Sequence, residues 1–164
     1  MARYSAAWST ITAVAVADTV AFTAGQAPGF LRSGAAGVQC KINEVYIGGE
    51  DTASTPTAFI LARTSTISVG ALSVGTTALM DVNSTAPTTL PSWGSTAATT
   101  FPQRSSTLYL LQPSMNTFGG IARWQARYGE EITAQGTTAT SGEVILSAKT
   151  GTGKTSGHIL YEVA

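Results

Sequence analysis

The feature that most constrains this chain is the shortness of its apolar and alternating stretches, which Gly, Ser, Thr and Pro interrupt throughout. Alternation with a period of two is typical of half-buried β-strands, and the turn-forming residues mark where such strands end. No stretch repeats apolar residues at the three- and four-residue spacing of an amphipathic helix. The pattern predicts strands over residues 11–23, 38–47, 58–63, 66–74, 107–112, 120–127, 131–134, 143–149 and 158–163.

Strands of this number and length suit two sheets packed face to face. We therefore expect an all-β fold, a two-sheet antiparallel β-sandwich with a jelly-roll or related Greek-key topology. Little or no helix is expected, with at most one helical turn at residues 76–81. The length of 164 residues suits a single domain spanning residues 1–164. Strand order within the sheets stays open at this stage.

Composition narrows the classes of function. Hydrophobic residues make up 43% of the chain and charged residues only 11%, which is less than half the usual charged share. Nine basic and nine acidic residues give a net charge of zero, so we expect no nucleic-acid partner. No apolar run has the length of a membrane-spanning helix, so we expect no membrane partner. With one histidine and one cysteine, the chain is expected to be no enzyme, with no cofactor and no small-molecule substrate.

The N-terminal stretch and the single cysteine both fit strands. Thr10 and Thr12 interrupt the apolar N-terminal stretch, which predicts a β-strand rather than a secretory signal. Cys40 occupies an alternating position and is predicted to be a buried small hydrophobe. A lone cysteine forms no intrachain disulfide, which fits synthesis in a reducing cytoplasm.

Residues 148–155, AKTGTGKT, formally match a phosphate-binding P-loop with Ala at the first glycine position. A P-loop needs a helix that opens at the lysine, so that phosphate can rest on the helix N-terminus. Ser156 and Gly157 instead lead directly into the strand-like sequence HILYEV. We therefore predict a Gly/Thr loop that joins two antiparallel strands as a hairpin.

Other candidate chemistry is sparse. His158 is expected to be a strand residue rather than a triad member, because no G-x-S-x-G nucleophile motif occurs. One His and one Cys do not supply the ligands of a usual zinc site. The acidic pairs Glu50–Asp51 and Glu130–Glu131 lack a recognised calcium-ligand spacing, and we expect them to be solvated loop charges. No metal site is predicted.

Two tryptophans outside the N-terminus offer contact surfaces. Trp93 lies in residues 83–106, a polar stretch without periodicity that holds three of the six prolines, and it is our candidate exposed-loop contact. Trp124 lies in the alternating sequence IARWQAR. Either its indole faces the core and Arg123 and Arg127 face outward, or the reverse, and core packing is the commoner fate of such a residue.

Four sets of residues together carry a family resemblance. Residues 41–63 contain a K-I-x-E strand and an F-x-x-x-R strand around a Gly/Thr/Ser-Pro loop, and residues 116–132 contain G-G-x-x-R-W-x-A followed by G-E-E. The closing motifs are G-E-V-I-L-S at residues 142–147 and S-G-H-I-L-Y-E at residues 156–162. The chain resembles small β-sandwich virion proteins of tailed bacteriophages.

The resemblance implies a capsid decoration (cement) protein, found on the capsid surface of the virion and made in the host cytoplasm. Its implied role is to bind the outside of a phage capsid and reinforce contacts between major capsid proteins, as a homo-oligomer with a trimer favoured. It implies no catalytic residue. Tyr4 and Trp8, in an N-terminal segment of about residues 1–10, are our candidate capsid-contact or oligomer-interface residues in a contact arm. The alternative, in which these residues simply cover the end of the sandwich, stays open.

Two other functions stay open. A glycan- or receptor-binding β-sandwich module of a phage tail or fibre would use Trp93 and its surrounding stretch. A single-jelly-roll coat protein that forms the shell itself is disfavoured, because the chain is neutral and has no basic arm to contact nucleic acid.

Overall fold

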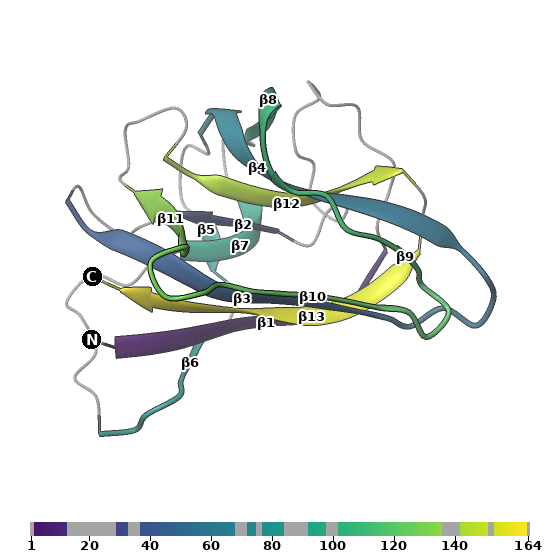
Figure 1. Ribbon diagram of the computed structural model, residues 1–164, viewed down its shortest axis with the longest axis horizontal. Coiled ribbons are helices and arrows are strands. Elements are labelled where there is room, and N and C mark those ends of the chain that lie inside the picture. Colours follow the sequence, from purple (N-terminus) through teal and green to yellow (C-terminus); the bar gives the residue numbers. More distant parts are fainter. Residues whose placement is uncertain are drawn as a thin grey trace.

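The computed structural model describes residues 2–12, 29–32, 37–67, 72–74, 77–83, 92–97, 102–135, 142–150 and 153–163. For residues 2–12, 72–74, 77, 92–97, 106–107 and 149–150 this description is of the backbone. The described residues form thirteen strands and no helix, in two antiparallel sheets packed against each other (Figure 1). The predicted all-β sandwich is confirmed.

The first sheet follows the order β10 (Ile121–Gln125), β3 (Gln39–Gly49), β13 (Lys154–Val163), β1 (Ala2–Thr12) and β6 (Thr77–Leu79), and β11 (Ile132–Gln135) pairs with β3. The second sheet follows the order β5 (Leu72–Val74), β7 (Ser92–Ala97), β2 (Gly29–Arg32), β12 (Val144–Thr150), β4 (Pro56–Thr66) and β8 (Gln103–Leu111), and β9 (Ser114–Asn116) pairs with β4.

Eight of these strands pair in a nested series. β1 pairs with β13, β2 with β12, β3 with β10 and β4 with β8. β13 also pairs with β3, and β12 also pairs with β4, so each sheet holds four of the eight. Nested antiparallel pairs divided alternately between two sheets are the arrangement of a jelly roll. The predicted jelly-roll topology is therefore present.

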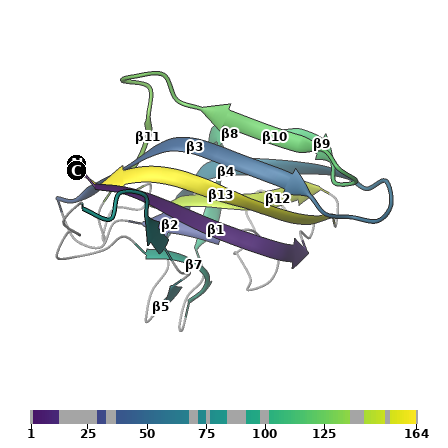
Figure 2. The same cartoon turned by 90° about the horizontal axis from the view of Figure 1, so that it is seen from below.

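The segment between β4 and β8 adds three strands at one side of the sandwich. β6 extends the first sheet beyond β1 (Figure 1), and β7 and β5 extend the second sheet beyond β2 (Figure 2). The polar connection expected at residues 83–106 is therefore wrong where β7 and the start of β8 lie. The helical turn expected at residues 76–81 is wrong where β6 lies. The Thr- and Ser-rich sequence of β7 pairs through its backbone and shows no apolar alternation, which is why periodicity missed it.

The core lies between the sheets and consists of the inward residues of β2, β3, β4, β11, β12 and β13. Cys40 is fully buried there, as predicted, and burial raises the pKa of its thiol to about 12, so the thiol stays neutral. A smaller buried cluster of Phe30, Ile60, Ala62 and Ile145 lies on the opposite face of the second sheet, because neighbouring residues of β4 point to opposite faces.

Two predictions about the strands are corrected, one on where the first strand begins and one on a hairpin. The strand expected at residues 11–23 begins earlier in the structure, since β1 runs from Ala2 to Thr12, and residues 13–23 lie outside the described residues. The hairpin expected across residues 148–155 is wrong, because β12 belongs to the second sheet and β13 to the first. The Gly/Thr segment therefore crosses between sheets, a topology that local sequence does not reveal.

Candidate functional site

A bulge in β3 places an acidic side chain on the outer face of the first sheet. Leu160 pairs with Glu44 while Tyr161 pairs with Ile42, so Asn43 has no opposite residue on β13. Ile42 and Val45 both lie in the core, and the extra residue between them shifts Glu44 to the outer face. Bulges commonly re-aim side chains in this way.

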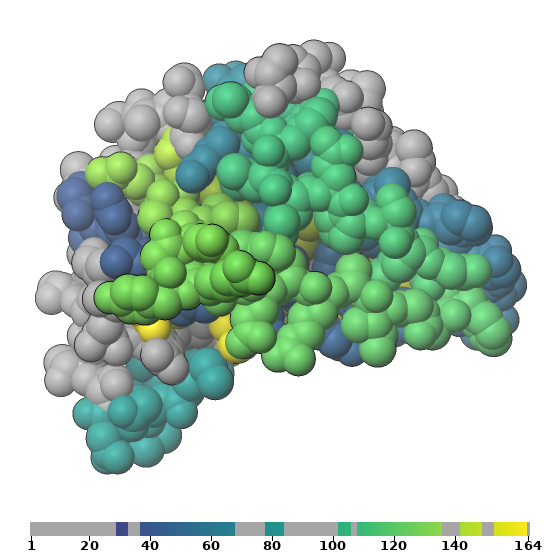
Figure 3. All heavy atoms as spheres, in the orientation of Figure 1, coloured from purple at the N-terminus to yellow at the C-terminus, as the bar shows by residue number. Residues whose placement is uncertain are grey.

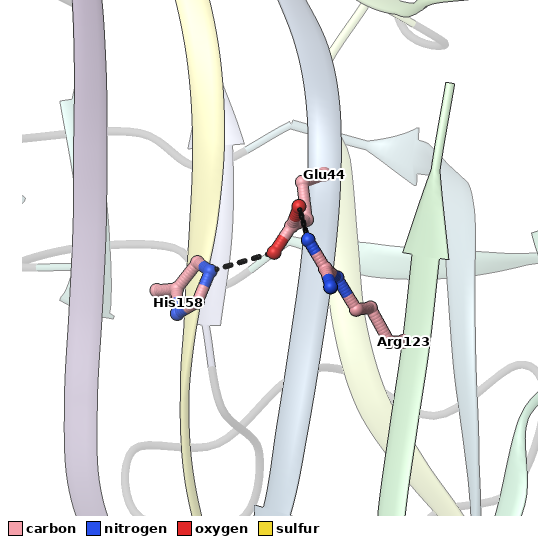
Figure 4. Close-up of polar contacts among 3 residues, drawn as sticks. All are labelled: Glu44, Arg123 and His158. Carbon is pink, nitrogen blue, oxygen red and sulfur yellow. Dashed lines mark hydrogen bonds and ion pairs between the residues drawn. The ribbon is translucent and has the colours of Figure 1, made fainter. Parts of the chain in front are cut away.

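Glu44 bridges the two strands that flank β3. One guanidinium nitrogen of Arg123, on β10, lies 2.8 Å from Glu44 Oε2, and Nε2 of His158, on β13, lies 3.0 Å from Glu44 Oε1 (Figure 4). The His158 ring also stacks on Tyr46, with ring centroids 5.2 Å apart. We call these four residues the Glu44 cluster.

The environment of Glu44 favours its charged form. Its side chain is only 7% exposed, and the hydrogen bond from Arg123, followed by that from His158, lowers the pKa of the carboxyl group against the opposing effect of burial. Both carboxylate oxygens have partners on neighbouring strands. The arrangement therefore joins β10, β3 and β13 across the outer face of the first sheet.

A second set of contacts holds three connections together at one end of the sandwich. The buried Thr117 hydroxyl contacts the Asp51 carboxylate and lies 2.8 Å from the carbonyl oxygen of Thr55. The backbone N–H of Lys154 donates to the same carboxylate of Asp51 over 3.1 Å. We call these contacts the Thr117 lock; they join the β3–β4 loop, the β9–β10 connection and the start of β13.

Asp51 is thus part of the protein's internal bonding rather than a solvated loop charge. The Thr117 hydroxyl is the main cause that lowers the pKa of Asp51. The described residues contain no group of three His, Cys, Asp or Glu that could hold a metal ion.

A cavity of about 460 Å³ opens between the two sheets at the side formed by β10 and the β8–β9 junction. Its floor is formed by Val45 and Ile47, and its walls include Ala122 and Trp124 on one side and Leu111 on the other. We call it the side cavity. Figure 3 shows this side of the molecule, where the green segments of β8–β9 and β10 lie side by side.

A second cavity, also of about 460 Å³, lies on the outer face beside the β3 bulge. Polar and charged side chains line much of it, including Lys41, Asn43 and Gln125. Tyr128 stands at its rim, fully exposed, in a turn closed by the hydrogen bond from Glu130 N–H to the carbonyl oxygen of Arg127. We call it the polar cavity.

The predicted contact residues are placed by their backbones alone. Tyr4 and Trp8 lie in β1, opposite Tyr161 and Gly157 of β13, so this segment is a paired strand within the sheet. Trp93 lies in β7, opposite Leu31 of β2, and not in a loop as expected. The side chains of these three residues lie outside the described part of the chain, and their contact roles stay predictions.

Two further predictions are resolved in favour of structural roles. Trp124 is half-buried and packs against the core while Arg123 is exposed on the outer face, which is the first of the two predicted orientations. Lys154, the lysine of the P-loop match, begins strand β13 instead of a helix. His158 lies within the same strand and contacts Glu44, a partner that was not predicted.

The Glu44 cluster escaped prediction because its members are far apart in the sequence. Glu44 is 79 residues from Arg123 and 114 residues from His158. The break in apolar alternation between Ile42 and Val45 was a usable signal for the bulge that positions Glu44.

The comparisons with known proteins add no relative: no family model, curated protein or solved structure matches this chain. Among the described residues, no helix is long and apolar enough to cross a membrane.

Proposed function

We propose that this chain is a structural virion protein that binds the outside of a tailed-phage capsid and reinforces contacts between major capsid proteins. Jelly rolls serve in viral capsid proteins and in lectins alike, so the fold is compatible with this role without selecting it. The selection comes from the particular residues that carry the family resemblance.

The observation that carries the proposal is the convergence of these motifs. Glu44 comes from the K-I-x-E motif, Arg123 from the R-W motif and His158 from the closing S-G-H motif, and all three meet in the Glu44 cluster. Arg63, from the F-x-x-x-R motif, donates to the carbonyl oxygen of Thr133 near the G-E-E motif. Residues that resemble one family from separate segments therefore contact one another as a set.

The proposed mechanism is mechanical. A protein that binds the assembled shell, and not free capsid subunits, shifts the equilibrium toward the intact shell. The neutral net charge gives little electrostatic steering, so shape and backbone contacts would supply the binding. A homo-oligomer, with a trimer favoured, would span several capsid subunits at once. Tyr4 and Trp8 remain our candidates for these contacts, as residues of a sheet strand and not of a free arm.

The direct experiment is to measure the copy number of this protein in purified virions against the major capsid protein. We expect near-stoichiometric amounts on the head, and shells that burst at lower temperature when the protein is missing. A few copies per particle would favour a tail or fibre role instead. Absence from virions would overturn the proposal.

One observation favours a second candidate, a glycan- or receptor-binding module of a tail or fibre. The polar cavity combines hydrogen-bonding side chains, such as Asn43 and Gln125, with the fully exposed ring of Tyr128 at its rim. Such a combination suits a sugar, which presents hydroxyl groups and an apolar face. On a glycan array, the parent protein should bind at least one glycan, and the variants Tyr128→Ala and Trp93→Ala should lose that binding. If the parent protein binds no glycan, this candidate function is removed.

A further inference from the structure

Among the described residues, β10 pairs with a strand on one side only. Its flanking bonds to β3 run from Gly49 N–H to the carbonyl oxygen of Gly120 and from Ala126 N–H to the carbonyl oxygen of Asn43. In an antiparallel ladder, alternate residues bond to the same neighbour. The even-numbered residues of β10 therefore bond to β3, and the N–H and C=O groups of Ile121, Arg123 and Gln125 point to the other side. No strand of the described residues pairs with β10 on that side.

This free edge borders a cavity with partly apolar walls. The side cavity opens beside it, and Ala122 and Trp124, on the inner face of β10, line that cavity. Its volume of about 460 Å³ lies in the range of pockets that hold ligands. Phe118 before β10 and Ile121 at its start are 59% and 63% exposed. An exposed edge next to a cavity with partly apolar walls is an arrangement that accepts an added strand, because alternate side chains of that strand can enter the cavity.

The charge on this edge selects among possible occupants. A second copy that paired all five residues of β10 with β10 of the first would place Arg123 opposite its own counterpart. Like charges at directly opposed positions destabilise strand pairing. Arg123 bonds to Glu44 through one guanidinium nitrogen, and its side chain is 57% exposed, so other N–H groups of the guanidinium stay accessible to a second carboxylate. A strand with a carboxylate opposite Arg123 avoids the repulsion and gains a charge-assisted contact.

We propose that the free edge of β10 binds an extended segment of another protein, which adds as an antiparallel strand with the pattern apolar–acidic–apolar. The two apolar residues lie opposite Ala122 and Trp124 and enter the side cavity, because directly opposed residues share a face. The acidic residue lies opposite Arg123 on the outer face. This inference is independent of the capsid role, since it rests only on the edge, the cavity and the charge.

The test uses the full chain and a synthetic peptide, acetyl-Ser-Val-Thr-Val-Glu-Val-Thr-Val-Ser-amide, with a control peptide that carries Lys in place of Glu. In titration calorimetry we expect the Glu peptide to bind at least about tenfold more tightly than the Lys peptide. In NMR spectra of the complex, the amide protons of Ile121, Arg123 and Gln125 should gain protection from exchange. Absence of Glu-peptide binding, equal binding of both peptides, or unchanged exchange would overturn the proposal.

A matched pair of variants tests the backbone contact. Gln125→Pro removes an N–H from the free edge while leaving the bonds to β3, and Gln125→Ala keeps that N–H. We expect Gln125→Pro to weaken Glu-peptide binding at least about tenfold, and Gln125→Ala to leave it within about twofold. A dimer in sedimentation that Gln125→Pro dissociates would assign the edge to a second copy and contradict the proposal.

Discussion

The two lateral sides of this jelly roll end differently. At the side of β1 and β2, each sheet continues into further strands, β6 in one case and β7 with β5 in the other. At the side of β10 and β8, no further strand of the described residues follows, and the side cavity opens between the sheets. Exposed edges invite pairing with other chains, and among the described residues β10 and β8 end their sheets, whereas β1 and β2 are followed by short added strands.

This difference raises the question of what holds β10 in place at the edge of its sheet, with no further strand of the described residues beside it. β10 is held to β3 by its ladder, by the bond from Arg123 to Glu44 on the outer face, and by the Thr117 lock at its N-terminal end. These contacts restrain the strand from three directions and leave its outer backbone groups unused. Substitutions at and around these contacts test how each restraint contributes.

The largest effect is expected for Gly49→Ala. A Cβ atom at Gly49 would lie 2.2 Å from the carbonyl oxygen of Thr117, and backbone atoms cannot easily yield. We expect a loss of about 3 kcal/mol of unfolding free energy, measured by urea denaturation. The matched control is Gly48→Ala, whose Cβ would meet only the Tyr46 ring at ordinary contact distance, and which should change stability by less than about 1 kcal/mol. Equal losses in both variants would contradict the close approach of Gly49 to the Thr117 backbone.

A proline pair tests the two directions of the β10 backbone. Ala122→Pro removes an N–H that the ladder alternation assigns to β3, and we expect a loss of about 3 kcal/mol. Gln125→Pro removes an N–H from the free side and should cost less than about 1 kcal/mol. Thermal or urea unfolding measures both. A larger loss for Gln125→Pro than for Ala122→Pro would reverse the assigned edge.

Glu44→Gln removes the charge that joins three strands. We expect a loss of about 2 kcal/mol at pH 7, because hydrogen bonds to a charged group are the stronger ones. The folded state lowers the pKa of Glu44 below its ordinary 4.5, so its stabilisation is present above that pH and is lost as pH falls through the folded-state value. The gap between parent and variant should therefore narrow below about pH 4.5, while Glu130→Gln, in an exposed turn, should change little. A gap that stays constant with pH would contradict the ionised contact.

The smallest loss is expected for Thr117→Val, which keeps the shape of the side chain and removes its hydroxyl group. We expect about 1 to 2 kcal/mol, because the Thr55 carbonyl oxygen and the Asp51 carboxylate lose a partner. Thr117→Ser keeps the hydroxyl and isolates the effect of the methyl group. The Thr117 side chain also lies close against Gly153, where an added Cβ would meet its methyl group at 2.4 Å. If serine costs as much as valine, this packing rather than hydrogen bonding holds this end of β10.

Features that depend on neighbouring residues in the chain, such as strand formation and side-chain burial, could be predicted from the sequence. Alternation and turn residues indicated an all-β sandwich, the buried position of Cys40, and a strand instead of a helix after the P-loop match, although this strand begins earlier than predicted, at Lys154. A jelly roll was among the predicted topologies, but the strand order was not derivable, because each pairing joins segments that are distant in the chain.

The errors share a physical cause. β7 has a Thr/Ser/Gly sequence without apolar alternation, so its pairing with β2 depends on the backbone and left Trp93 in a predicted loop. The prediction of a hairpin between β12 and β13 was wrong, because these strands lie in different sheets. A Gly/Thr-rich sequence is equally suited to a turn within one sheet and to a connection between two sheets. The Glu44 cluster requires the register of β10, β3 and β13 together, which only the folded chain supplies.

The most direct test of the open side is amide hydrogen exchange of the free protein, followed by NMR. Tyr4, Ser5 and Ala6 of β1 lie between β13 and β6, so their amides should all be protected. In β10, Ala122 and Trp124 should be protected while Ile121, Arg123 and Gln125 exchange rapidly. Uniform protection along β10 would mean that its outer edge is already occupied, and would contradict the account.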